Sequence, residues 1–139
     1  MPTITLISGQ AIGHGFLLAL CHDFRIQNSR GSSLCIQEGR PATAFPSKWM
    51  IDFVNAKLLA PNIARSFIAG KSLRARDAVR SGLVDKTGSF KDALRFVEKE
   101  RLLDAGTKYG YCTEKELRNR NAITLLDSRH GREIKSHRL

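Results

Sequence analysis

Short runs of apolar and β-branched residues dominate the first 36 positions of the chain. Residues 3–8 favour a strand that ends in a turn at Gly9. Residues 16–21 are almost wholly apolar, which predicts a short helix that is buried on every side. Residues 23–27 alternate polar and apolar side chains and predict a second strand, and residues 33–36 predict a shorter third strand.

Helical spacing replaces this pattern after residues 39–47, where prolines and a glycine predict a loop. Ser47 is placed to cap a helix that runs to about Leu58. Pro61 suits the first turn of the next helix, which Gly70 closes. The chain therefore changes from strands to helices before its midpoint.

A third helix is predicted over residues 74–81, with Gly82 as its stop and an extended segment at residues 83–85. Ser89 and Asp92 have the spacing of a capping box, in which each residue bonds the other's backbone N–H. This signal predicts a fourth helix that begins directly after Ser89.

The same spacing recurs at Thr113 and Glu116, which predicts a last helix over residues 117–126. From Asp127 onward the sequence is charged, and we expect a frayed tail.

This order of elements predicts an α/β fold in which short strands precede a mostly helical C-terminal half. Three short strands do not make a well-covered sheet, which indicates that further strands are needed. We expect residues 1–88 to form the core and residues 89–139 to form a C-terminal helical region with a charged tail.

Positive charge is in excess, because 23 Lys and Arg residues face 13 Asp and Glu residues, for a formal net charge of +10. The excess is spread along the chain without a block of five like charges. Such a field favours anionic partners: nucleic acid, a phosphorylated cofactor or an acidic surface. No apolar run approaches the length of a transmembrane helix, and no secretory signal is visible at the N-terminus.

Three cysteines, Cys21, Cys35 and Cys112, share no C-x-x-C spacing, and we expect reduced, mostly buried thiols. The four histidines form no H-x-x-x-H pair, so the sequence predicts no metal site.

The most distinctive local feature is the glycine-rich turn ahead of the apolar helix, where Gly13 and Gly15 flank His14. Backbone N–H groups at a helix N-terminus suit an anion or a developing oxyanion. A second interpretation stays open, in which the glycines only let the helix pack closely against the strand.

The segment around this turn, residues 2–15, resembles the signature of the enoyl-CoA hydratase/isomerase (crotonase) family, roughly P-x-I-A-A-[IV]-x-G-x-A-x-G-[GA]-G. The similarity continues in family order at residues 21–26 (CHDFRI), 69–73 (AGKSL) and 78–85 (AVRSGLVD). Residues 30–38 (RGSSLCIQE) are similar to the corresponding run of the delta-isomerase branch. The resemblance covers about 85 residues.

The resemblance implies a partial crotonase-like spiral and an enzyme that acts on acyl-CoA. In that family two backbone N–H groups bind the thioester oxygen, and a carboxylate moves a proton at the adjacent carbon. The resemblance assigns one donor to the backbone of His14, with Ala11, Gly13 and Gly15 as substrate-binding neighbours. Glycine or alanine is usual at the position of His14, and its imidazole is a departure that would crowd the thioester.

Hydratases of the family use two glutamates, and the first of these positions is Leu17 here. The second falls on Glu38, which is similar to the single base of the isomerases. The resemblance therefore implies an enoyl-CoA delta-isomerase of fatty acid β-oxidation that moves a double bond between C3 and C2. Such a base needs an apolar pocket that raises its pKa toward neutrality, and Cys35 and Ile36 near Glu38 fit this need.

Two other residues invite catalytic roles. Asp23 follows His22, but adjacent strand residues point to opposite faces, so we expect Asp23 to be structural. Cys35 has no evident base nearby, so we expect it to be packed in the core.

Members of the family are longer than this chain, and the resemblance implies that a preceding segment supplies the second oxyanion donor. CoA belongs to the substrate, so no separate cofactor is expected. The expected partners are an acyl-CoA, whose phosphates would meet basic residues such as Lys71, Arg74 or Arg76, and further copies of the chain in a homo-oligomer if the fold is complete.

Two alternatives stay open: a catalytically inactive, shortened homologue that acts through association, and a basic RNA-binding member. Aromatic residues make up only 7% of the chain, which disfavours RNA binding. The last four residues, 136–139, resemble a weak peroxisomal address. Because the resemblance to delta-isomerases points there as well, the peroxisome is the expected location, ahead of the cytoplasm or the mitochondrion.

Overall fold

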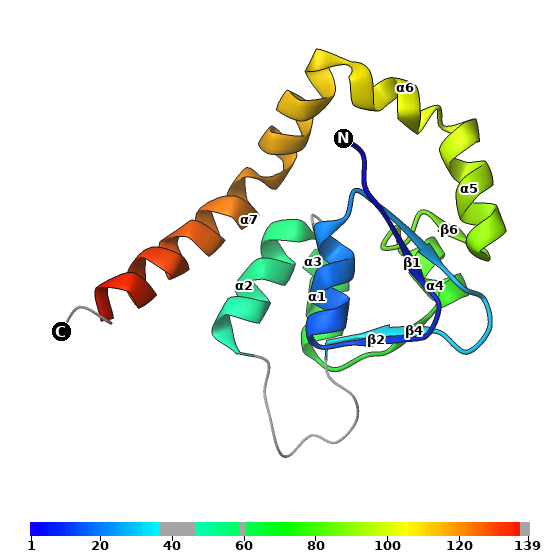
Figure 1. The fold of residues 1–139 in the computed structure, drawn as a ribbon. Coiled ribbons are helices and arrows are strands. Elements are labelled where there is room, and N and C mark those ends of the chain that lie inside the picture. The colour runs from blue at the N-terminus through cyan, green and yellow to red at the C-terminus, as the bar shows by residue number, and fades with distance from the viewer. Residues whose placement is uncertain (37–46, 59–60, 137–139) are drawn as a thin grey trace.

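The computed structural model describes residues 1–36, 47–58 and 61–136. In this part of the chain two small sheets meet beside a group of short helices, and three further helices form an arc along the outside (Figure 1). The α/β class and the helical C-terminal half are confirmed.

The first sheet has the order β1-β3-β6, and all of its strands are parallel. β1 (Ile4–Ile7) and β3 (Phe24–Gln27) are the two strands predicted by the N-terminal pattern. β6 (Lys86–Thr87) pairs with the end of β3, one residue beyond the segment predicted to be extended.

The second sheet has the order β2-β4-β5. β2 (Gln10–Ile12) runs parallel to β4 (Ser33–Cys35), and β5 (Leu73–Arg74) runs antiparallel to β4. The sequence predicted β4 but neither β2 nor β5. The described residues thus contain more short strands than the sequence predicted. Each of the segments 4–12 and 24–35 supplies one strand to each sheet.

The helices largely follow the predicted order. Their bounds are α1 His14–Cys21, α2 Lys48–Lys57, α3 Pro61–Ile68, α4 Ala75–Arg80, α5 Phe90–Lys99, α6 Leu102–Thr107 and α7 Tyr109–Ser136. Gly70 and Gly82, the two predicted stops, both have positive φ angles, of 79° and 73°. Glycine adopts this left-handed geometry at little cost, which explains why α3 and α4 end there.

The C-terminal region corrects three predictions. α6 was not predicted at all. α7 begins at Tyr109, so Thr113 lies inside the helix and does not cap it. The helix also continues to Ser136, where the sequence predicted a frayed tail from Asp127 onward. In Figure 1 the C-terminal part of α7 extends away from the rest of the chain.

α1 lies at the centre of the main hydrophobic core. Phe16 and Leu20 are 0% and 1% exposed, and they belong to a cluster with Leu34, Val54 and Leu83. The prediction of complete burial was wrong, because Leu18 on the same helix is 63% exposed. The neighbouring elements cover only part of the helix, so an apolar sequence alone did not decide which side faces solvent.

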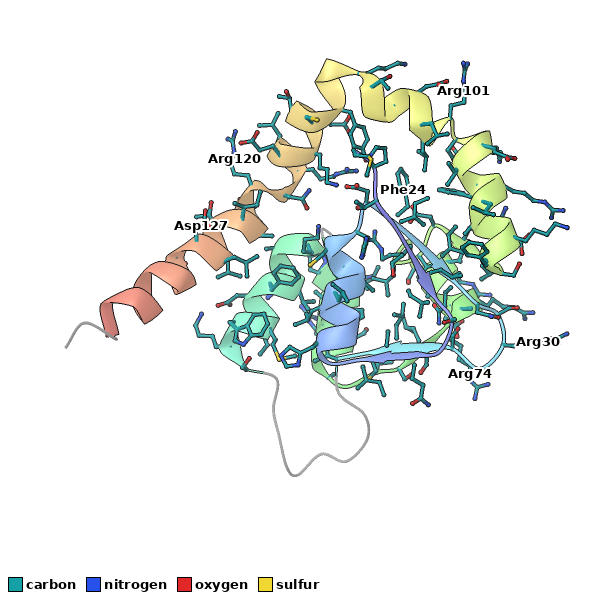
Figure 2. The ribbon with its side chains drawn as sticks, in the orientation of Figure 1. Phe24, Arg30, Arg74, Arg101, Arg120 and Asp127 are labelled. Carbon is teal, nitrogen blue, oxygen red and sulfur yellow. The ribbon has the colours of Figure 1, made fainter. Side chains whose placement is uncertain are left out.

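A second, smaller core joins the first sheet to α5 and α6. It contains Ile26, Ala93, Phe96 and Leu102, and the rings of Phe24 and Phe96 meet edge to face at 5.5 Å. Figure 2 labels Phe24 in this region. Within the described residues no helix is long and apolar enough to cross a membrane.

All three cysteines are free thiols. Cys35 is buried, as expected, but Cys21 and Cys112 are exposed, so the prediction of mostly buried thiols was wrong. Cys21 is the last residue of α1 and Cys112 lies on α7, and neither is covered by a neighbouring layer.

Candidate functional site

The glycine turn connects β2 to α1 through Gly13, which has φ 56° and ψ −117°. A residue with a β-carbon is strained in this geometry, so glycine is required here. The backbone N–H of Gly13 donates to the carbonyl oxygen of Cys35 at 3.0 Å. A β-carbon at Gly13 would lie 3.6 Å from the carbonyl oxygen of Ile36. The turn is therefore fastened to the end of β4.

α1 begins directly after this turn, at His14. The carbonyl oxygen of Gly13 accepts from the N–H of Leu17 at 3.1 Å, which is the first bond of the helix. The N–H groups of His14 and Gly15 precede that bond and have no acceptor within the helix. They form the positive end of the helix dipole, which suits a negatively charged oxygen.

The imidazole of His14 is exposed and lies beside α2. Its ring centre is 6.0 Å from that of Trp49, with the two planes inclined by 35°. Trp49 packs partly against the main core, so the side chain of His14 borders the N-terminal half of α2. The backbone N–H of His14 thus lies at the start of α1, whereas its imidazole lies beside α2.

The structure brings four of the predicted site residues together in one turn. Ala11 is buried on β2 and pairs with Leu34 of β4, and Gly13, His14 and Gly15 follow it. Glu38, the predicted base, lies outside the described residues. The structure therefore describes the part of the predicted site that supplies the backbone donor, but not the predicted base.

Leu17 closes the first turn of α1 and is 5% exposed within the main core. No carboxylate is present at this position, which the resemblance assigns to the first glutamate of hydratases. Within the described residues no group of three His, Cys, Asp or Glu side chains could hold a metal ion.

The side chain of Asp23, which lies outside the glycine turn, is 2% exposed and accepts several hydrogen bonds. Its carboxylate accepts from the N–H and the hydroxyl of Thr3, at 2.8 and 2.9 Å. It also accepts from Lys115 at 2.7 Å and from Arg118 at 3.2 Å. Burial by itself raises the pKa of Asp23, but the hydrogen bonds from Lys115 and Thr3 outweigh burial and leave this pKa below its ordinary value.

The structural role expected for Asp23 is therefore confirmed, but its partners on α7 were not predicted. Lys115 and Arg118 are three residues apart, so they share one face of the helix. This three-residue spacing was the only sign in the sequence that the two cations share a partner. Pairs of charged residues on exposed helix surfaces commonly have the same spacing. Tyr111 lies on the same helix, and burial together with the Asp23 charge raises its pKa.

Arg25 is a second, partly buried charged residue, and its guanidinium bonds backbone carbonyl groups. Its guanidinium donates to the carbonyl oxygens of Leu83, at 2.6 Å, and of His22, at 2.9 Å. Burial lowers the pKa of Arg25 from its usual value, and the nearby Asp85 carboxylate acts in the opposite direction. Asp85 also accepts from the backbone N–H of Arg25 at 2.8 Å. This arrangement joins β3 to the segment that precedes β6.

Comparison with known proteins identifies relatives of this chain. The sequence model of the family described as enoyl-CoA hydratase/isomerase matches residues 1–102. A curated relative, the peroxisomal enoyl-CoA delta isomerase 2 of Arabidopsis thaliana, is 31% identical over 86 residues, which are 61% of this chain and 35% of the relative. The chain thus spans about a third of the length of the curated relative that it matches.

Solved structures show the same fold. A monofunctional enoyl-CoA isomerase from M. smegmatis has a TM-score of 0.58 at 23% identity, covering 94% of this chain and 56% of that one. A probable enoyl-CoA hydratase from Mycobacterium tuberculosis has a TM-score of 0.73 at 17% identity, covering 91% and 53%. The chain therefore has a crotonase fold over about half the length of these structures, and it belongs to the enoyl-CoA hydratase/isomerase family.

Proposed function

We propose that this chain carries one side of an enoyl-CoA delta-isomerase site, in which the His14 backbone N–H binds the thioester oxygen and Glu38 moves the proton. The supporting observation is the hydrogen bond of 3.0 Å from the Gly13 N–H to the Cys35 carbonyl oxygen, which holds the start of α1 at the end of β4. Glu38 follows Ile36 by two residues in the sequence.

The proposed reaction moves one proton within the substrate. The Glu38 carboxylate removes a proton from C2 of a 3-enoyl-CoA, and the electrons delocalise onto the thioester oxygen. The N–H of His14 stabilises that oxygen, where the negative charge develops. Glu38 then returns the proton at C4, and the double bond moves from C3–C4 to C2–C3. CoA is part of the substrate, so the proposal includes no cofactor.

Leu17 supports isomerisation over hydration. Adding water across a double bond in this family uses two carboxylates, whereas shifting the double bond uses one. A leucine that is 5% exposed supplies neither a base nor an acid. The name of the curated relative, a delta isomerase, points in the same direction.

Exposed cations on the second sheet are candidates for the CoA phosphates. Arg74 lies on β5, which pairs with β4, and Lys71 and Arg76 flank it. Figure 2 shows Arg74 at the edge of the molecule, on the same side as Arg30. We propose that a phosphate of CoA binds at this edge. The thioester would then lie at the end of β4 beside the glycine turn, and the phosphate at the other end of the same strand.

The proposed setting is fatty acid β-oxidation in the peroxisome. The support is the name of the curated relative, which is peroxisomal, and the basic C-terminal residues that resemble a targeting signal. A fluorescent fusion that leaves the C-terminus free, compared with one lacking the last three residues, tests this location.

The decisive experiment measures conversion of 3-decenoyl-CoA to 2-decenoyl-CoA by the chain and by Glu38→Gln. We expect Glu38→Gln to lower kcat at least about a hundredfold, because general acid–base catalysis contributes about 10²–10⁴. Glu98→Gln is the matched control, since Glu98 is exposed on α5 and its loss leaves the glycine turn unchanged.

Equal activity of the parent chain and Glu38→Gln would contradict the assignment of the base. No activity in either protein would instead favour an inactive homologue that acts through association. RNA binding remains a prediction. A steep salt dependence of RNA affinity would distinguish it from a role of the basic residues in binding CoA.

A further inference from the structure

A cavity of about 420 Å³ lies between the C-terminal end of α1, α2 and α7. Its volume is within the range of about 300–1,000 Å³ that is usual for small-molecule sites. Much of its wall is apolar, and the apolar side chains are Phe53, Ala122, Ile123 and Leu126, together with Met1. Ile123 and Leu126 are 43% and 45% exposed, so a ligand in this cavity would cover apolar surface that faces solvent.

The cavity lies away from the glycine turn. Cys21, at the end of α1, lines it, whereas His14 begins the same helix. Eight helical residues span about 12 Å. A ligand in this cavity would therefore occupy the opposite end of α1 from the proposed oxyanion donors.

One end of the cavity is cationic. Lys57 is partly buried there, and its ammonium group donates to the side-chain oxygen of Asn119. Burial lowers the pKa of Lys57, which means that its charge has lost part of its hydration. Within the described residues no carboxylate lies at ion-pair distance from Lys57. An anion in the cavity would supply the missing counter-charge.

The carboxylate of Asp23, which contributes to the charge around Lys57, is already engaged. Asp23 accepts hydrogen bonds from Thr3, Lys115 and Arg118, as described above. A smaller cavity of about 130 Å³ adjoins the first and shares Lys57 and Asn119 with it.

Cations outnumber carboxylates in the walls of the two cavities. The cations are Lys57, Lys115, Arg25 and Arg118, and the carboxylates are Asp23 and Glu116. The local field thus favours a negatively charged ligand group at Lys57.

We propose that this cavity is a second ligand site, which binds a medium-chain alkyl carboxylate with its anionic group at Lys57 and its hydrocarbon chain along the apolar face of α7. An apolar wall with one charged group at its end matches an amphiphile of this kind better than a polar anion or a neutral hydrocarbon. The site is independent of the proposed isomerase chemistry, because it uses none of the residues of the glycine turn.

Decanoate is the test ligand, and its binding is measured by calorimetric titration and by backbone amide NMR shifts. We expect saturable binding, with shifts at Lys57, Asn119 and Ile123 and none at Gly13 to Gly15. Lys57→Met keeps the side-chain stem but removes the charge, and it should weaken decanoate binding about tenfold. Lys91→Met, on the exposed surface of α5, is the matched control and should bind as the parent chain does.

Two comparison ligands separate the charge from the hydrocarbon. Decanol should bind about tenfold more weakly than decanoate, and Lys57→Met should not change its affinity. Should Lys57→Met fail to fold, Ile123→Glu provides a second variant, because this position is partly exposed and a carboxylate there would repel decanoate.

The proposal fails if decanoate shows no saturable binding, or if Lys57→Met binds decanoate as tightly as the parent chain. It also fails if anionic phospholipid vesicles are bound but free decanoate is not. Activity toward 3-decenoyl-CoA does not enter these outcomes, so this site and the proposed isomerase site are tested separately.

Discussion

The carboxylate of Asp23 accepts a hydrogen bond of 2.7 Å from the ammonium of Lys115, although 92 residues separate the two along the chain. Asp23 precedes β3 and also bonds Thr3, ahead of β1, so one side chain joins the first sheet to α7. Arg118 bonds the same carboxylate from the next turn of the helix. The position of α7 therefore depends on the buried carboxylate of Asp23, which lies far from the helix in the sequence.

We expect Asp23→Ala to lower the free energy of unfolding by about 3 kcal/mol, because it leaves Lys115 and Arg118 without their buried counter-charge. Urea denaturation measures this loss. Asp104→Ala is the matched control, since its ion pair with Arg101, at 2.9 Å, is exposed and should contribute less than about 1 kcal/mol. Equal losses in the two variants would contradict the structural role of Asp23.

Acid should weaken the same connection. The pKa of Asp23 is lower in the folded chain than its ordinary value of 3.8, so the unfolded chain binds the proton first as pH falls. The contribution of Asp23 is complete above about pH 5 and is lost as pH falls through 3.8 toward the lowered value. Urea titrations between pH 3 and 7 should show a shallower acid limb for Asp23→Asn than for the parent chain. Parallel limbs would rule out this linkage.

The two glycines beside His14 should respond in opposite directions to alanine. Gly13→Ala forces a β-carbon into φ 56° and should cost about 1–3 kcal/mol. Gly15→Ala lies within α1 with open space around the new methyl group and should stabilise the chain by up to about 1 kcal/mol. Thermal and urea unfolding measure both effects, and a stabilising Gly13→Ala would be incompatible with the turn geometry described here.

Two predicted helix caps also differ in the structure. The Ser89 side chain accepts from the N–H of Asp92, and Asp92 bonds back to the N–H of Ser89, so Ser89→Ala should cost about 1 kcal/mol. Ser47 precedes α2 without a side-chain capping bond, so Ser47→Ala should change stability by less than about 0.5 kcal/mol. Urea midpoints of the two variants provide the comparison, and a larger loss in Ser47→Ala would reverse the assignment.

Several parts of the fold could be predicted because their causes are local. The capping box of Ser89 and Asp92 closes within three residues, and the glycine stop at Gly82 needs only its own φ angle. The strands β1 and β3 carry enough β-forming residues to be recognised without their partners. The glycine turn was also predictable, because its backbone geometry depends mainly on a few consecutive residues.

Other parts could not be predicted because they depend on distant partners. β2, β5 and β6 have two or three residues each, and they count as strands only because β3 and β4 lie beside them. The exposure of Leu18 depends on how far the neighbouring elements cover α1.

The sequence by itself therefore determined the order of the major elements, the glycine turn and the family to which the chain belongs. Tertiary structure alone decided where α7 lies, because Lys115 and Arg118 face the carboxylate of Asp23, which directly precedes β3 of the first sheet. It also decided which apolar residues line the cavity beside Lys57. Local signals act over a few residues, whereas the burial of a charge or a side chain depends on whatever the whole fold places next to it.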